Sequence, residues 1–144
     1  MSIRTSLETI FIRRDFGLLV LRVGLGGFMA AHGWGKVLGG PETWQKLGGA
    51  MRHIGLSGEM LFTAFGLAGT LAEFLGGILL LIGLYTRTSA FFLLCTMIVA
   101  ALEVNSRGGD FLMTTARPLE LAVVFLALMF IGSGRYAVKP GSAA

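Results

Sequence analysis

The sequence predicts an all-α membrane protein, a polytopic four-helix bundle. Its 144 residues are 54% hydrophobic and only 14% charged, whereas a soluble domain is typically about 25% charged. Glycine accounts for 22 of the residues, and glycine is more frequent in transmembrane helices than in soluble ones. Four apolar stretches meet or approach the length of about 20 residues that a helix needs to cross the hydrocarbon core.

The predicted spans are residues 16–34, 60–85, 88–102 and 118–132. The last two are short, so they must use flanking residues or thin the bilayer locally. Trp34, Trp44 and Tyr85 lie near the predicted span ends, where interfacial aromatic residues are enriched. The sequence therefore predicts one bundle domain, residues 16–138, followed by a short tail, residues 139–144.

The first 15 residues are predicted to form a separate short helix that lies in the membrane interface. One face of this helix carries Ile3, Leu7, Ile10 and Phe11. The alternative is a cleavable signal peptide that ends near Ala31. The charge of Arg22 inside the apolar run and the late position of the cleavage site argue against that alternative.

The expected location is the inner (plasma) membrane, with both termini in the cytoplasm. The orientation rests on a small excess of basic residues on the side of the termini. That side carries Arg4, Arg13, Arg14, Arg87, Arg135 and Lys139, and the other carries Lys36, Lys46, Arg52, Arg107 and Arg117. The net charge of +4 is scattered along an apolar chain, which excludes a nucleic-acid partner. The expected partners are the lipid bilayer and either another protein or further copies of the chain.

Small residues at spacings of four predict the faces through which the first two spans pack. In lipid, helices associate through close contact of small residues rather than through a hydrophobic driving force. The predicted packing positions are Gly27 and Ala31 in the first span, and Ala68, Ala72 and Gly76 in the second.

Arg22 and Glu73 lie inside the first and second predicted spans, where a lone charge costs at least about 2.5–3.5 kcal/mol. Trp34 lies twelve residues beyond Arg22, and Glu59 fourteen residues before Glu73. These separations correspond to about 18 and 21 Å along a helix. Because the two spans are antiparallel, the sequence predicts that Arg22 and Glu73 form a buried ion pair. The pair would either fix the helix register or have a direct function.

A second group of polar residues is predicted at the interface that follows the first span. His32 and Lys36 share one helix face, and Glu120 begins the fourth span at a comparable predicted depth. A histidine near a carboxylate can exchange protons or contact a quinone headgroup, so these three residues are the candidate catalytic residues. Arg117 and Glu103 are expected at the same interface. The alternative is a set of interfacial anchors, with the lysine reaching toward water.

The sequence predicts no metal site and no covalently bound cofactor. Cys95 is the only cysteine in the chain, which excludes intrachain disulfide chemistry. The two histidines, His32 and His53, are two ligands short of a closed zinc site. We expect His53 to be a solvated loop residue.

Three blocks of the sequence resemble the DoxX family of small four-helix membrane proteins. They are LRVGLGGFMAAHGWGKV (21–37), AEFLGGILLLIGLYTRTSA (72–90) and RPLELAVVFLALMFIGSGRYAV (117–138). The resemblance implies four helices and carries over Arg22, His32, Gly33, Lys36, Glu73, Gly76, Gly77, Gly83, Glu120, Gly134 and Arg135. The usual family ending is close to GPGRYSLD, whereas this chain reads GSGRYAVK and lacks the proline and the acidic residue.

Named members of that family are described as membrane subunits of a thiosulfate:quinone oxidoreductase, or as membrane partners of soluble redox and sulfur-handling enzymes. The resemblance therefore implies a membrane subunit of a redox system that binds a quinone, anchors an oxidoreductase, or both. The chain has no redox cofactor motif, so a partner must supply the electrons, and whether the chain is itself an enzyme stays open. The alternatives are a non-catalytic assembly subunit and a small-solute carrier with Arg22 and Glu73 lining a polar cavity.

Overall fold

The structure is a computed structural model that describes residues 3–108 and 110–138, with side chains described from Arg14 onward. Its elements are α1 (Ile3–Leu38), α2 (Gly40–Gly48), the 3-10 helix η1 (Gly49–Ile54), α3 (Glu59–Ile82), α4 (Thr86–Ser106), the π-helical turn η2 (Phe111–Thr115) and α5 (Ala116–Ile131). Within these ranges there is no strand. Four segments are long and apolar enough to cross a membrane: Arg14–Leu38, Glu59–Ile82, Thr86–Ser106 and Phe111–Ile131. The predicted all-α, four-span fold is confirmed.

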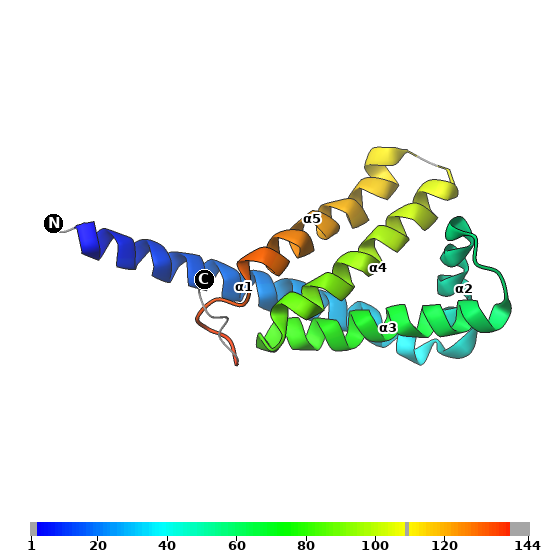
Figure 1. Ribbon diagram of the computed structural model, residues 1–144, viewed down its shortest axis with the longest axis horizontal. Helices are drawn as coiled ribbons and strands as arrows, with labels where there is room; N and C mark the ends of the chain where they lie inside the picture. Colours follow the sequence, from blue (N-terminus) through cyan, green and yellow to red (C-terminus); the bar gives the residue numbers. More distant parts are fainter. Residues whose placement is uncertain (1–2, 109, 139–144) are drawn as a thin grey trace.

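The four long helices form two pairs. In one pair α1 runs beside α3, and in the other α4 packs against α5. The second pair crosses the first at an angle, and the two pairs diverge toward the end of α3 on which α2 packs (Figure 1). The third and fourth spans extend into flanking residues, as their short predicted lengths required.

The first helix differs from the prediction of a separate interfacial segment. The α1 helix is continuous over 36 residues, a length of about 54 Å. The stretch around residue 15 contains no proline, and Gly17 is its single glycine. A glycine inside a helix costs only about 1 kcal/mol, so a long helix tolerates it and continues through the predicted boundary.

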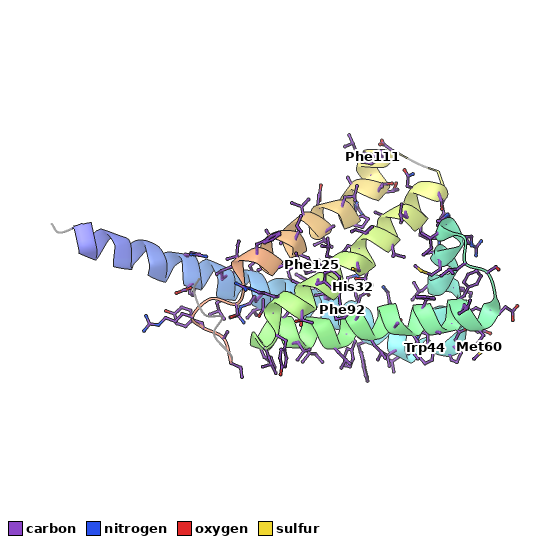
Figure 2. The ribbon with its side chains drawn as sticks, in the orientation of Figure 1. His32, Trp44, Met60, Phe92, Phe111 and Phe125 are labelled. Carbon is purple, nitrogen blue, oxygen red and sulfur yellow. The ribbon has the colours of Figure 1, made fainter. Side chains whose placement is uncertain are left out.

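The core lies where the two helix pairs converge. Its buried members come from α1, α3, α4 and α5, and they are Leu18, Met29, Leu80, Ala90, Leu93, Met97, Ala122, Phe125 and Leu128. Phe125 of α5 (Figure 2) is fully buried and is the largest hydrophobic side chain of this set. The core therefore joins the second helix pair to the first.

The α1 and α3 backbones come into direct contact at glycines. A Cβ atom at Gly33 would collide with the backbone of Phe74, and one at Gly77 would collide with the backbones of Gly26 and Ala30. In lipid, such close approach is a main source of helix association. These glycines let the α1 and α3 backbones approach each other closely.

The predicted packing residues are mostly rotated away from this contact face. Ala31 and Ala68 are exposed, and Gly27 and Ala72 are only partly buried. Gly76 is buried, but it packs against α4 rather than against α1. A spacing of four residues turns by about 40° per step on a helix of 3.6 residues per turn. A stripe with that spacing therefore leaves a straight contact face after a few steps.

Two further elements that were not predicted, α2 and η1, pack on α3 and cover its first half. A Cβ at Gly48 would collide with the Phe62 carbonyl, and one at Gly66 would collide with the backbone of Trp44. Pro41 occupies the first turn of α2, where its missing N–H costs little. The consequence is that α1 contacts α3 mainly along the second half of α3.

Substituting Gly77 by Ala should destabilise the protein by about 1–3 kcal/mol, because overpacking forces backbones apart. Gly69 is the matched control, since it lies in the same helix and a Cβ there would meet no atom within 4 Å. Gly69→Ala should be neutral or stabilising by up to about 1 kcal/mol, from helix propensity. The measurement is thermal unfolding of the purified chain in detergent, and equal effects of both variants would contradict the contact.

Candidate functional site

Lys36 and Glu73 form an ion pair between α1 and α3. The Lys36 ammonium lies 2.6 Å from Glu73 Oε1, and it also donates to Oε2. Glu73 is only 5% exposed, whereas 28% of the Lys36 side chain is exposed. A carboxylate buried inside an apolar helix pair is therefore neutralised by a cation that keeps some contact with its surroundings.

The surrounding elements hold this pair in place from both sides. Lys36 lies in the last turn of α1, where a cation interacts favourably with the helix dipole. Trp44 of α2 donates from Nε1 to the Lys36 carbonyl at 3.0 Å, which satisfies a carbonyl at the helix end. The rings of Trp34 and Phe74 pack with centroids 5.4 Å apart, and Phe74 directly follows Glu73 in the chain.

His32 lies one helical turn before Lys36 and is exposed (Figure 2). Its Nδ1 lies 3.0 Å from the carbonyl oxygen of Phe28. A carbonyl only accepts hydrogen bonds, so Nδ1 carries the proton and donates. In the neutral imidazole this leaves Nε2 with a lone pair available to accept a hydrogen bond. The Lys36–Glu73 pair therefore has an exposed acid–base group as its neighbour on α1.

The predicted Arg22–Glu73 ion pair is wrong. Glu73 is bound by Lys36, and Arg22 instead donates from Nη2 to the backbone carbonyl of Tyr136. Arg22 contacts α3 at the level of Gly83. Gly83 is ten residues beyond Glu73, which is about 15 Å along a helix.

The error lies in the depth assigned to Trp34. The prediction treated Trp34 and Glu59 as marking the same interface. In the structure Trp34 packs against Phe74, which lies fifteen residues beyond Glu59. The intervening half of α3 is covered by α2, so α1 is shifted along α3 by that amount.

The predicted cluster of His32, Lys36 and Glu120 is not assembled. Among the described residues, no hydrogen bond or ion pair joins Glu120 to either of the other two. Glu120 is exposed in the first turns of α5, on the part of α5 that diverges from α1 (Figure 1). The opposite end of α5 meets α1, where Leu18 and Leu128 help to line an apolar cavity of about 390 Å³.

Glu103 joins η1 to the end of α4. Its Oε2 lies 3.0 Å from His53 Nε2, and its Oε1 accepts from Nε and Nη2 of Arg107 at 3.0 and 2.8 Å. His53 is exposed, as the sequence suggested, but it lies in η1 rather than in a loop and contacts Glu103. Arg117, which was expected near Glu103, is exposed on α5. No local sequence signal connects His53 with Glu103, because fifty residues separate them.

The surroundings of Arg22 were not predicted from the sequence either. The residues after α5, 132–138, are called here the C-terminal segment, and they fold back onto α1 and α3. Val138 N–H donates to the Ile82 carbonyl at 3.1 Å, and Arg135 N–H donates to Asp15 Oδ1 at 3.2 Å. Gly83 has φ +75°, and a side chain there would collide with Arg22. The glycine at the end of α3 was the available sequence signal.

The fold and these charged groups define a multi-pass helical membrane protein with ionised side chains inside its spans. The sequence pattern of the DoxX family matches residues 17–106. The chain is also 32% identical over 127 residues to the inner membrane protein YqjF of Escherichia coli (strain K12). The aligned region covers 86% of this chain and 90% of that protein. No solved structure matches the chain. This chain belongs to the DoxX family and is a multi-pass inner membrane protein.

The ion pair predicts an asymmetric response to mutation. Lys36→Met leaves a buried, uncompensated carboxylate and should destabilise the protein by about 3–5 kcal/mol. Glu73→Gln should cost less, because the partly exposed lysine can extend toward water. The double variant should recover part of the loss, with an interaction energy of at least about 0.5 kcal/mol.

The measurement is the free energy of unfolding in detergent for the complete double-mutant cycle. Glu59→Gln is the control, because Glu59 lies exposed in the first turn of the same helix and should contribute less than about 1 kcal/mol. Strictly additive effects of the Lys36 and Glu73 substitutions would contradict the pair.

Proposed function

We propose that the chain is the membrane component of a redox system, and that it binds the headgroup of a quinone beside Lys36, Glu73 and His32. The observation that carries this proposal is the buried Lys36–Glu73 pair with an exposed imidazole one turn away. Intramembrane charges are expensive and commonly mark functional sites. Glu120, a candidate from the sequence, is not part of this site.

The donors and acceptors of this site suit both oxidation states of a quinone. Lys36 has three N–H groups and makes two hydrogen bonds to Glu73, so one N–H remains to donate to a quinone carbonyl. Neutral His32 offers Nε2 as the acceptor for a quinol hydroxyl. A bound quinone would supply the two-electron redox chemistry.

Proton exchange is the second requirement for this function, because quinone reduction takes up protons. His32 lies in the last two turns of α1 and is not enclosed by the described chain, so its Nε2 is the group that we propose to take up a proton and release it toward the site. Lys36 also places positive charge where negative charge develops on a quinone oxygen during reduction. The exposed imidazole and the ammonium therefore have different roles in the same site.

The electrons are proposed to come from a partner protein, so that the chain acts as a subunit of a larger system. We further propose that both termini lie in the cytoplasm, on the basis of the distribution of basic residues. This orientation directs the Lys36 end of α1 away from the cytoplasm.

A non-catalytic assembly role is the second candidate function, and exposed apolar side chains favour it. Phe28, Val123 and Phe130 are among the exposed large hydrophobic residues of the spans, and they suit contact with lipid or with another membrane subunit. In this role the Lys36–Glu73 pair would only fix the register. The carrier hypothesis receives no support, because Arg22 and Glu73 lie about 15 Å apart along α3.

The two histidines provide a matched test of the redox proposal. Binding of a short-chain quinol to the chain in lipid nanodiscs should weaken about five- to tenfold in His32→Gln, as expected for the loss of one hydrogen bond. His53→Gln is the control, because His53 contacts Glu103 at a different site. Unaltered quinol binding in His32→Gln, or no binding to the unsubstituted chain, would favour the assembly role.

A further inference from the structure

Arg22 is a buried charge that the proposed quinone site does not use. It is 0% exposed and lies inside the first span. Nη2 donates to the Tyr136 carbonyl, whereas Nε and Nη1 have no hydrogen-bond partner among the described residues. A guanidinium has five N–H donors and no acceptor. Its surroundings therefore supply far fewer acceptors than a buried cation requires.

Other unpaired donors lie at the same end of the bundle. Thr86 and Ser89, in the first turn of α4, are buried, and their hydroxyls also have no partner among the described residues. Thr86 follows Gly83 by three residues, and Gly83 lies directly against Nη1 of Arg22. Where α1 meets the turn between α3 and α4, the described chain thus has several buried polar groups without a hydrogen-bond partner.

The C-terminal segment covers this end of the bundle as a single layer of chain. Ala137 packs against Gly83 beside the Arg22 guanidinium. Tyr136 and Val138 are nevertheless 47% and 70% exposed, so the described chain does not enclose them. Backbone hydrogen bonds attach the segment, including the one from Val138 N–H to the Ile82 carbonyl.

We propose that Arg22 is the binding site for an oxyanion, a carboxylate or phosphate group, and that the C-terminal segment is its cover. A guanidinium binds an oxyanion at two points through the Nε and Nη2 edge or the Nη1 and Nη2 edge. Arg22 is fully buried, and Tyr136 and Ala137 of the C-terminal segment lie against its guanidinium and the adjoining Gly83. An oxyanion therefore reaches either edge only when this segment moves away, and its binding is coupled to detachment of the segment.

The oxyanion has two possible sources, which the experiment separates. One is the phosphate of an anionic phospholipid, and the other is a small anion from solution. Arg22 lies eight residues after Arg14, the residue at which the first span begins. Arg22 is therefore about 12 Å from that end of the span, measured along α1. A lipid phosphate and a small carboxylate or phosphate from solution each present two oxygen atoms that can accept hydrogen bonds from the guanidinium.

The test follows amide hydrogen exchange in residues 132–138 of the full-length chain. The probes are sodium acetate and inorganic phosphate for the chain in detergent, and nanodiscs of phosphatidylglycerol compared with phosphatidylcholine. The bound oxyanion should speed exchange of this segment about 5- to 150-fold, the usual range of coupling between two binding events. An effect of acetate or phosphate identifies a free anion as the source. An effect of phosphatidylglycerol, with no effect of phosphatidylcholine, acetate or phosphate, identifies an anionic phospholipid as the source.

Arg22→Lys should abolish the response, because a lysine keeps the charge but has no planar fork. Arg14→Gln is the control for charge at the membrane surface, since Arg14 is exposed, and it should respond as the unsubstituted chain does. An equal response in Arg22→Lys, or no response to any of the probes in the unsubstituted chain, would overturn the proposal.

A second pair of variants tests the coupling without changing Arg22. Val138→Pro removes the N–H that bonds to the Ile82 carbonyl, so it should loosen the cover and lower the oxyanion concentration needed for half-maximal exchange. Val138→Ala keeps this N–H and should leave that concentration unchanged. Identical midpoints in the two variants would show that the C-terminal segment does not compete with the anion.

Discussion

A charge buried among apolar helices must find its partner inside the protein, and this constraint determines how α1 sits on α3. Lys36 reaches Glu73 only in the register in which the glycine contacts of Gly33 and Gly77 also form. Glycine packing alone specifies closeness, whereas the ion pair also specifies the position along the helix. Packing and charge therefore select the same arrangement, as expected for a sequence whose local choices agree with its fold.

The segments that do not cross the membrane complete both charged sites. Trp44 of α2 binds the carbonyl of Lys36, and Tyr136 of the C-terminal segment provides the acceptor for Arg22. The two sites differ in access to the surroundings, because Lys36 is partly exposed and Arg22 is fully buried. That difference suits the first site for proton exchange and the second for a ligand that must displace a cover.

The four spans follow from hydropathy and length alone, so the sequence predicts them well. The charge partners depend on which half of α3 is covered by α2, and α2 is a nine-residue helix with little apolar character that hydropathy does not reveal. Sequence identifies Arg22, His32, Lys36 and Glu73 as unusual residues within or beside the spans. It does not pair them, because antiparallel helices can slide by several turns without changing their composition.

Cysteine cross-linking in intact membranes tests the register of α1 on α3 most directly. In a Cys95→Ser background, the account predicts that cysteines replacing Lys36 and Glu73 are joined by a short thiol-specific cross-linker. Cysteines replacing Arg22 and Glu73 should not be joined, since about 15 Å along α3 separates their levels. Cross-linking of the second pair and not the first would contradict the account.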